Sequence, residues 1–179
     1  AGLASMSMLN TGLTFHLFSI FNDSGLSSSV AASVFVPIAA TGAIVQLAGG
    51  LAISRVPVHL LLVLALLLEA LILVWAPMLS SQRMAYTFGF FMGMQGGLEM
   101  IVSSVIFANY FGRRHLGSIA GFASTLLVAA SALGPMPIGV ARDLMGSYQT
   151  VLTVFALLPF ALAIACALFC KQPGIPAEE

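Results

Sequence analysis

Charged residues are scarce in this chain of 179 residues, at 7% of the sequence, whereas apolar residues make up 60%. Average soluble domains carry about 25% charged and about 45–50% apolar residues. So few charges cannot form the hydrated shell of a soluble domain, which excludes that class. The formal net charge is zero and the sequence has no basic run. We therefore expect a lipid bilayer as partner and no nucleic acid.

Residues that carry enzyme or metal chemistry are also few. The two cysteines, Cys166 and Cys170, are four residues apart in one apolar segment, and we interpret them as small hydrophobic residues. Only one of the three histidines, His16, lies within a long apolar run. The sequence contains no Gly-x-Ser-x-Gly pattern, which disfavours a serine enzyme. We expect no metal, no cofactor and no enzymatic activity.

Long apolar runs, separated by short polar links, are what the sequence has in quantity. A bilayer core needs about 20 mostly apolar residues per helix, and the chain divides into six segments at about that interval. The predicted spans cover residues 3–21, 27–53, 60–75, 86–110, 118–140 and 148–169. We therefore expect an all-α membrane protein: a six-transmembrane-helix bundle over 1–170, followed by a polar cytoplasmic tail, 171–179.

Basic residues in the links predict the orientation of the spans. One side of the predicted topology has Arg55, Arg113, Arg114 and Lys171, and the other has Arg83 and Arg142. Links rich in lysine and arginine stay in the cytoplasm, so we expect both termini there. The chain begins with alanine, close to a predicted span. We interpret it as a piece of a longer protein.

The fourth predicted span has a stripe of small residues. Gly89, Gly93 and Gly97 recur at every fourth position and so lie on one face of a helix. Small residues at this spacing let the backbone of a second helix approach closely. We expect a helix–helix contact there.

A second stripe on the same span is polar and consists of Gln95, Glu99 and Ser103. An ionisable group at membrane depth is costly and often has a function. Glu99 is therefore a candidate proton carrier. The alternative is a protonated carboxyl that serves only to pack neighbouring helices.

The first predicted span has a polar arc of its own. The arc contains Asn10, Thr11 and Thr14, begins at Ser7, and is extended by the aromatic residues Phe18 and Phe21. Such an arc is typical of a helix that lines a watery cavity, although hydrogen bonding between helices is an alternative. With Gln95, Glu99 and Ser103, its three central residues are the candidate substrate-cavity residues.

Other polar groups and helix breakers are harder to interpret. His16 lies on the opposite side of the first span; it is a second candidate for proton coupling, with a packing role favoured. Glu69 lies in the leucine-rich third span, and its partner cannot be identified from the sequence. Pro37 interrupts the second span, and Gly134 and Pro135 interrupt the fifth. Such breaks occur at bends in transporters or as fixed kinks used in helix packing.

The residues from 109 to 121, Asn-Tyr-Phe-Gly-Arg-Arg-His-Leu-Gly-Ser-Ile-Ala-Gly, resemble the link between the tenth and eleventh helices of major facilitator transporters. The likeness is to the bacterial monocarboxylate and oxalate/formate antiporter-like branch. It includes a cytoplasmic loop motif made of Gly112, Arg113, Arg114 and Gly117. Further matches are Ala132-Leu133-Gly134-Pro135, Gly139, Arg142-Asp143 and Gly146-Ser147-Tyr148. Thr14-Phe15-His16 and Gly25-Leu26-Ser27 resemble the seventh helix and its exit.

This resemblance implies the C-terminal half of a twelve-helix transporter that works by alternating access. The implied partners are an N-terminal six-helix half or a second copy, and a small-molecule substrate. The implied substrate is a small organic anion such as a monocarboxylate, carried across a bacterial inner membrane. Cavity-lining roles in this family would fall on the first and fourth spans, which are the two with polar stripes.

Two departures from the family pattern accompany the likeness. The loop signature Gly-x-x-x-Asp-Arg-x-Gly-Arg has Ser54 at its acidic position and Pro57 at its second glycine. The second and fifth predicted spans have no basic residue that would bind an anion. The sequence therefore predicts a secondary active transporter of a small solute. A non-transporting scaffold or truncated remnant, and an intramembrane enzyme, are the alternatives.

Overall fold

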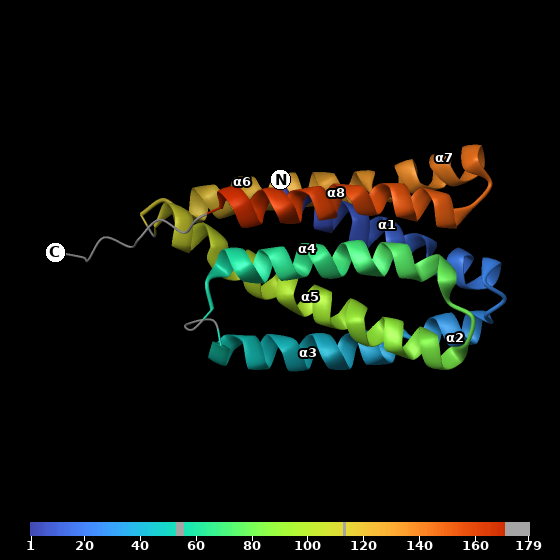
Figure 1. Ribbon diagram of the computed structural model, residues 1–179. Helices are drawn as coiled ribbons and strands as arrows, with labels where there is room; N and C mark the ends of the chain where they lie inside the picture. The colour runs from blue at the N-terminus through green and yellow to red at the C-terminus, as the bar shows by residue number, and fades with distance from the viewer. Residues whose placement is uncertain (53–55, 113, 171–179) are drawn as a thin grey trace.

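The structure is a computed structural model that describes residues 1–52, 56–112 and 114–170. Those residues form helices and connecting turns without strands, which confirms the all-α fold class. The helices are α1 (Gly2–Asp23), α2 (Ser28–Ser33), α3 (Phe35–Ala52), α4 (Val58–Trp75), the short 3₁₀ helix η1 (Ala76–Met78), α5 (Gln82–Phe111), α6 (Leu116–Leu133), α7 (Pro135–Met145) and α8 (Tyr148–Phe169). They run alongside one another in an elongated bundle, which α5 crosses obliquely (Figure 1).

Five stretches of the described chain are long and apolar enough to cross a membrane. They are Ser28–Gly50, Val58–Met78, Gln82–Phe111, Leu116–Met145 and Tyr148–Phe169. The first predicted span corresponds to α1, which has 22 residues but is not among the five. Its serine, asparagine and threonine residues make it more polar than the other long helices. The five apolar stretches indicate an integral membrane protein.

Two of the predicted spans are each divided into two helices next to proline. α2 gives way to α3 at Val34, where Pro37 has no N–H to donate to the carbonyl of Ser33. α6 gives way to α7 at Gly134, and Pro135 begins the new helix. Both breaks contact a glycine of another helix, Gly89 for Val34 and Gly12 for Gly134. The breaks are therefore part of the interhelical packing.

The helices pack in two sets that are joined by α4. α3 packs extensively against α5, and α1 packs against α6 and α7. α4 contacts α5 and α8, whereas α1 and α5 contact each other only sparingly. In lipid, such contacts are stabilised by close packing more than by exclusion from water. The sparse contact between α1 and α5 leaves room for a cavity.

Candidate functional site

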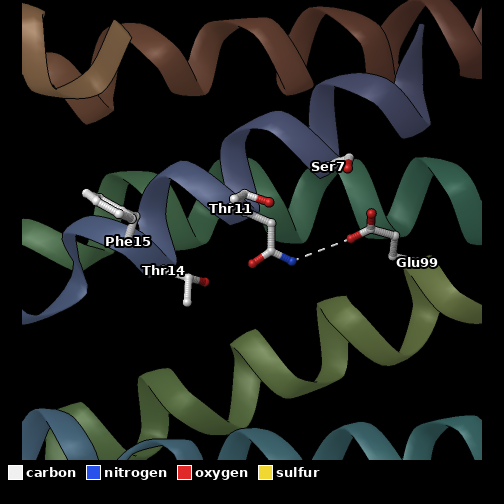
Figure 2. Close-up of a pocket in the computed structure, with 6 residues that line it drawn as sticks. Ser7, Thr11, Thr14, Phe15 and Glu99 are labelled. Atoms are coloured by element: carbon white, nitrogen blue, oxygen red, sulfur yellow. Dashed lines mark hydrogen bonds between the residues drawn. The ribbon is translucent and has the colours of Figure 1, made fainter. Parts of the chain in front are cut away.

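A cavity of about 370 Å³ lies between α1 and α5. Its lining residues are Ser7, Asn10, Thr11, Thr14, Phe15 and Glu99. Figure 2 shows the labelled hydroxyl residues on α1, with the carboxyl of Glu99 on α5 turned toward them. The two helices therefore present their polar side chains to one another across the cavity.

A second cavity, of about 410 Å³, shares Asn10 and Thr14 with the first. It extends between α1, α3 and α5, where Gln46 and Met100 are among its lining residues. Because two side chains belong to both cavities, we treat them as parts of one site. The combined site has a polar side on α1 and a largely apolar side on α3.

Asn10 connects the two helices by hydrogen bonds. Its Nδ2 atom donates to Gln95 Oε1 at 3.2 Å and to Glu99 Oε2 at 3.5 Å. Gln95 Nε2 also donates to Glu99 Oε2, at 3.4 Å. These distances are at the long end of the hydrogen-bond range, where bonds are weak. A bound solute can therefore replace them at a small cost in free energy.

The predicted cavity residues have three different positions. Asn10, Thr11, Thr14 and Glu99 line the cavity. Gln95 is fully buried and touches the site through its hydrogen bonds. Ser103 is not among the lining residues, and its hydroxyl donates to the carbonyl of Met100 in its own helix at 3.0 Å.

The aromatic residue of the cavity is a different one from those that the polar arc predicts. Phe21 is fully buried in the apolar core, where its ring lies 6.3 Å from that of Phe88. Phe15 lines the cavity and is 71% exposed. The expectation that Phe21 extends the cavity-lining arc is therefore wrong, because α5 covers its ring. The sequence signal for Phe15 is its position one helical turn after Thr11.

Ser7 also lines the cavity, and its hydroxyl donates to the carbonyl of Leu127 on α6 at 3.0 Å. This bond fixes α1 against α6 at one end of the site. Ser7 begins the predicted polar arc, so its spacing places it on the correct face of α1. Its bonding partner, 120 residues further along the chain, has no signal in the sequence.

His16 lies away from the cavity and connects three helices. Its Nε2 atom is 3.0 Å from the carbonyl oxygen of Pro135, and its Nδ1 atom is 3.1 Å from the hydroxyl of Tyr148. A carbonyl oxygen only accepts, so we assign the ring proton to Nε2; the Tyr148 hydroxyl then donates to Nδ1. The ring lies against Gly139 of α7, where a Cβ atom would be 3.4 Å from it. This geometry favours a packing role.

The small residues of α5 lie against α3. A Cβ atom at Gly93 would overlap the carbonyl oxygen of Ile38, and one at Gly97 would lie 2.8 Å from Val45. A similar approach joins the break before Pro135 to α1, because a Cβ atom at Gly134 would overlap the carbonyl oxygen of Met8. Glycine allows the backbones to come this close.

The loop motif predicted at Gly112, Arg113, Arg114 and Gly117 lies partly within the described residues. Gly112 ends α5 with φ at +71°, a conformation that favours glycine. Arg114 and Gly117 are exposed. Arg113, the Ser54–Arg55 pair and the tail 171–179 lie outside the described residues.

The electrostatics of the site are dominated by one group. Glu99 is the only ionisable side chain among the described residues that line either cavity. The other polar lining groups are hydroxyls and amides, which are neutral. Within the described ranges, no three histidine, cysteine or acidic side chains gather as a metal site. The arrangement can therefore bind a small polar solute and exchange a proton at Glu99.

Comparison with known proteins leaves the family open. A scan against protein-family models and a search of curated proteins both found no match to this chain. The function is therefore inferred from the chemistry of the cavity and from the fold.

Proposed function

We propose that the chain is the C-terminal six-helix half of a secondary active transporter of the major facilitator type, which moves a small solute by alternating access. The observation that supports this proposal is the polar cavity between α1 and α5. Four of the predicted polar residues, Asn10, Thr11, Thr14 and Glu99, line it, within a bundle whose other long helices are strongly apolar. A purely structural scaffold needs close packing and has no use for such a cavity.

The openness of the cavity supports the idea of a second half. Thr11 and Phe15 are exposed at its edge, so the cavity opens at the surface of the described bundle. An N-terminal six-helix half, or a second copy of this chain, would cover that opening. Solute would then bind between the two halves, as the alternating-access mechanism requires.

Two classes of solute fit this site. The first is a small organic anion, which the resemblance of residues 109–121 favours. In that case Glu99 takes up one proton on one side of the membrane and releases one on the other, so anion and proton cross together. The second class is a neutral or cationic polar solute, which is favoured by the absence of a basic lining residue among the described ones.

The topology is also part of the proposal. Both chain ends lie on the cytoplasmic side of a bacterial inner membrane, since the links at that end have more arginine and lysine. Insertion of a reporter after residue 170 would test this topology. Activity at this position of a reporter that works only outside the cytoplasm would contradict the topology.

Uptake into proteoliposomes tests the transport function. The protein used is the product of the longest open reading frame that contains this chain. Uptake of labelled small carboxylates, sugars and amines is measured across a pH gradient. Asn10→Ala removes the bridge between α1 and α5. The matched control is Thr153→Ala, because the Thr153 hydroxyl donates only to the Gln149 carbonyl of its own helix, at 2.7 Å.

Saturable uptake that falls in Asn10→Ala and persists in Thr153→Ala would support the proposal and identify the solute class. A lack of uptake of carboxylates, sugars and amines alike would contradict it and favour the scaffold or remnant alternative. Equal activity in both variants would exclude the α1–α5 cavity as the solute site.

A further inference from the structure

Helix α4 carries a carboxyl that the proposed function leaves unused. Glu69 is 1% exposed, and within the described part of the chain its Oε1 atom has no hydrogen-bond partner. Its sequence neighbours on α4 are leucine and alanine. A charge buried in this way is costly unless it is paired or protonated. The position therefore calls for a specific explanation.

Glu69 lies where two apolar clusters meet. On α4, Leu68 belongs to one cluster and Ala70 to the other, so the boundary between the two clusters lies at Glu69 itself. On α5, the boundary between the two clusters lies between the buried residues Met92 and Leu98. The bundle interior therefore has a polar layer between two apolar regions, and Glu69 is part of this layer.

Gln95 is the member of this layer on α5, between Met92 and Leu98. It is fully buried and is bonded to the cavity residues Asn10 and Glu99. It therefore connects the cavity to the interior of the bundle. Glu99 lies one helical turn beyond Gln95 on α5, and α5 packs against α4, so these two packed helices each carry a carboxyl near this layer.

On α8, the layer contains Pro159, which lies between Ala156 of one cluster and Ala163 of the other. Proline has no N–H, so the carbonyl of Phe155 lacks its usual helical donor. α8 packs extensively against α4. The helix that packs against α4 therefore has a backbone carbonyl without its helical donor next to this layer.

Other titratable groups on the helices packed against α4 have partners elsewhere or lie at the helix ends. On α1, His16 bonds Tyr148 of α8, and Asp23 pairs with Arg142. Cys166 bonds the carbonyl of His59. The remaining titratable groups lie toward the helix ends: Arg83, Tyr86 and Tyr110 on α5, and Cys170 just after α8. Helix η1 has no titratable side chain. Glu99 is thus the charged group that acts on Glu69.

We propose that Glu69 is a second proton-binding carboxyl of the transport cycle, coupled to Glu99 across the α4–α5 contact. Two carboxylates within range of one another in a low-dielectric interior cannot both be ionised at low cost. The pair therefore holds at least one proton at all times. When Glu99 gives its proton to the cavity, Glu69 stays a neutral acid. The proton of Glu69 then passes to the Glu99 carboxylate, which leaves Glu69 as the carboxylate of the pair.

This inference rests on the proposed transport function, but infrared spectroscopy tests it without transport. The full protein carrying Glu99→Gln is reconstituted in lipid and titrated from acidic to alkaline pH. Glu69 is then the fully buried carboxyl that remains among the described residues. Its protonated C=O band, in apolar surroundings, is separate from those of hydrated acids such as Asp143.

We expect that band to disappear as the pH rises, and to be absent throughout in Glu69→Gln/Glu99→Gln. A band that stays constant over the whole titration would make Glu69 a permanently protonated packing group and would overturn the proposal. A band that is absent at every pH would show a permanent carboxylate and would also overturn it.

A transport readout separates this proposal from the proposed function. Glu69→Gln should lower the number of protons moved per solute by one, while Glu69→Asp, which keeps the acid, should retain it. An unchanged proton count in Glu69→Gln would contradict the role in the cycle. If the wild-type protein shows the titrating band but transports nothing, the transport function fails and the proton site remains.

Discussion

The two faces of α5 differ in how they meet their neighbours. On one face, Gly93 and Gly97 bring the backbone of α5 into close contact with α3. On the other, Glu99 and Asn10 meet across a cavity through hydrogen bonds of 3.2 to 3.5 Å. One 30-residue helix therefore provides both a close-packed contact and an open polar site.

The difference shows how the sequence separates stability from function along one helix. The glycines recur every fourth residue, and the polar stripe recurs at the same interval but is shifted around the helix axis. Close packing on α3 holds α5 in place, so the face that carries Glu99 can remain unfilled. Substitutions on the two faces should therefore have different effects: loss of stability on one and loss of uptake on the other.

The largest effect should come from filling the close-packed face. Gly93→Leu places a side chain where the Ile38 carbonyl lies, and we expect a loss of about 3 kcal/mol or more in unfolding free energy. Thermal unfolding in detergent, followed by the fluorescence of Trp75, measures it, because Trp75 packs on Phe88 and Phe91 of α5.

The matched control for this substitution is Gly96→Leu. A Cβ atom at Gly96 meets nothing within 4 Å, and leucine favours a helix over glycine by up to about 1 kcal/mol. We expect equal or slightly higher stability, with a narrower second cavity. Equal destabilisation by both variants would contradict the distinction between the two faces.

The next largest effect should come from the polar face. Glu99→Gln keeps the shape of the side chain but removes the proton site. We expect pH-gradient-driven accumulation of solute to fall by about 10- to 100-fold, the equivalent of about 1.4–2.8 kcal/mol. The pH dependence of uptake should flatten. Unchanged pH dependence in this variant would exclude Glu99 as the proton carrier.

A smaller effect is expected at His16, on the side of α1 that faces away from the cavity. His16→Gln cannot satisfy both Pro135 and Tyr148 in the same geometry, so we expect a loss of about 1 kcal/mol in stability. The pH profile of uptake should not change. A shifted profile with normal stability would instead assign His16 to proton coupling.

The smallest effect is expected at Ser103, one turn beyond Glu99. Ser103→Ala removes only a hydrogen bond to its own helix, so stability should change by less than about 0.5 kcal/mol. Uptake should equal that of the wild-type protein. A marked loss of uptake would extend the site beyond the described cavity.

Periodicity predicts the part of the site that depends on single helices. Asn10, Thr11, Thr14 and Glu99 were predictable because α1 and α5 are uninterrupted, so spacing determines which residues share a face. The presence of helix breaks was predictable from proline, which lacks the N–H that the ladder needs.

Contacts between distant segments could not be predicted from spacing. Phe21 and Phe15 both lie near the polar arc, and only the position of Phe88 decides that Phe21 is buried. His16 and Glu69 are similar cases. The partners of His16 lie more than a hundred residues away, and the polar layer around Glu69 depends on three helices, α4, α5 and α8, that meet at one level.

The accessibility of Thr14 tests the central claim most directly. Thr14→Cys is made in a Cys166→Ser/Cys170→Ser background and treated with a membrane-impermeant maleimide, with Thr153→Cys on the exposed side of α8 as the control. We predict that Thr14→Cys is labelled, that Thr153→Cys in lipid is not, and that transported solute slows the labelling. An unreactive Thr14→Cys, or labelling that no solute slows, would contradict a solute cavity between α1 and α5.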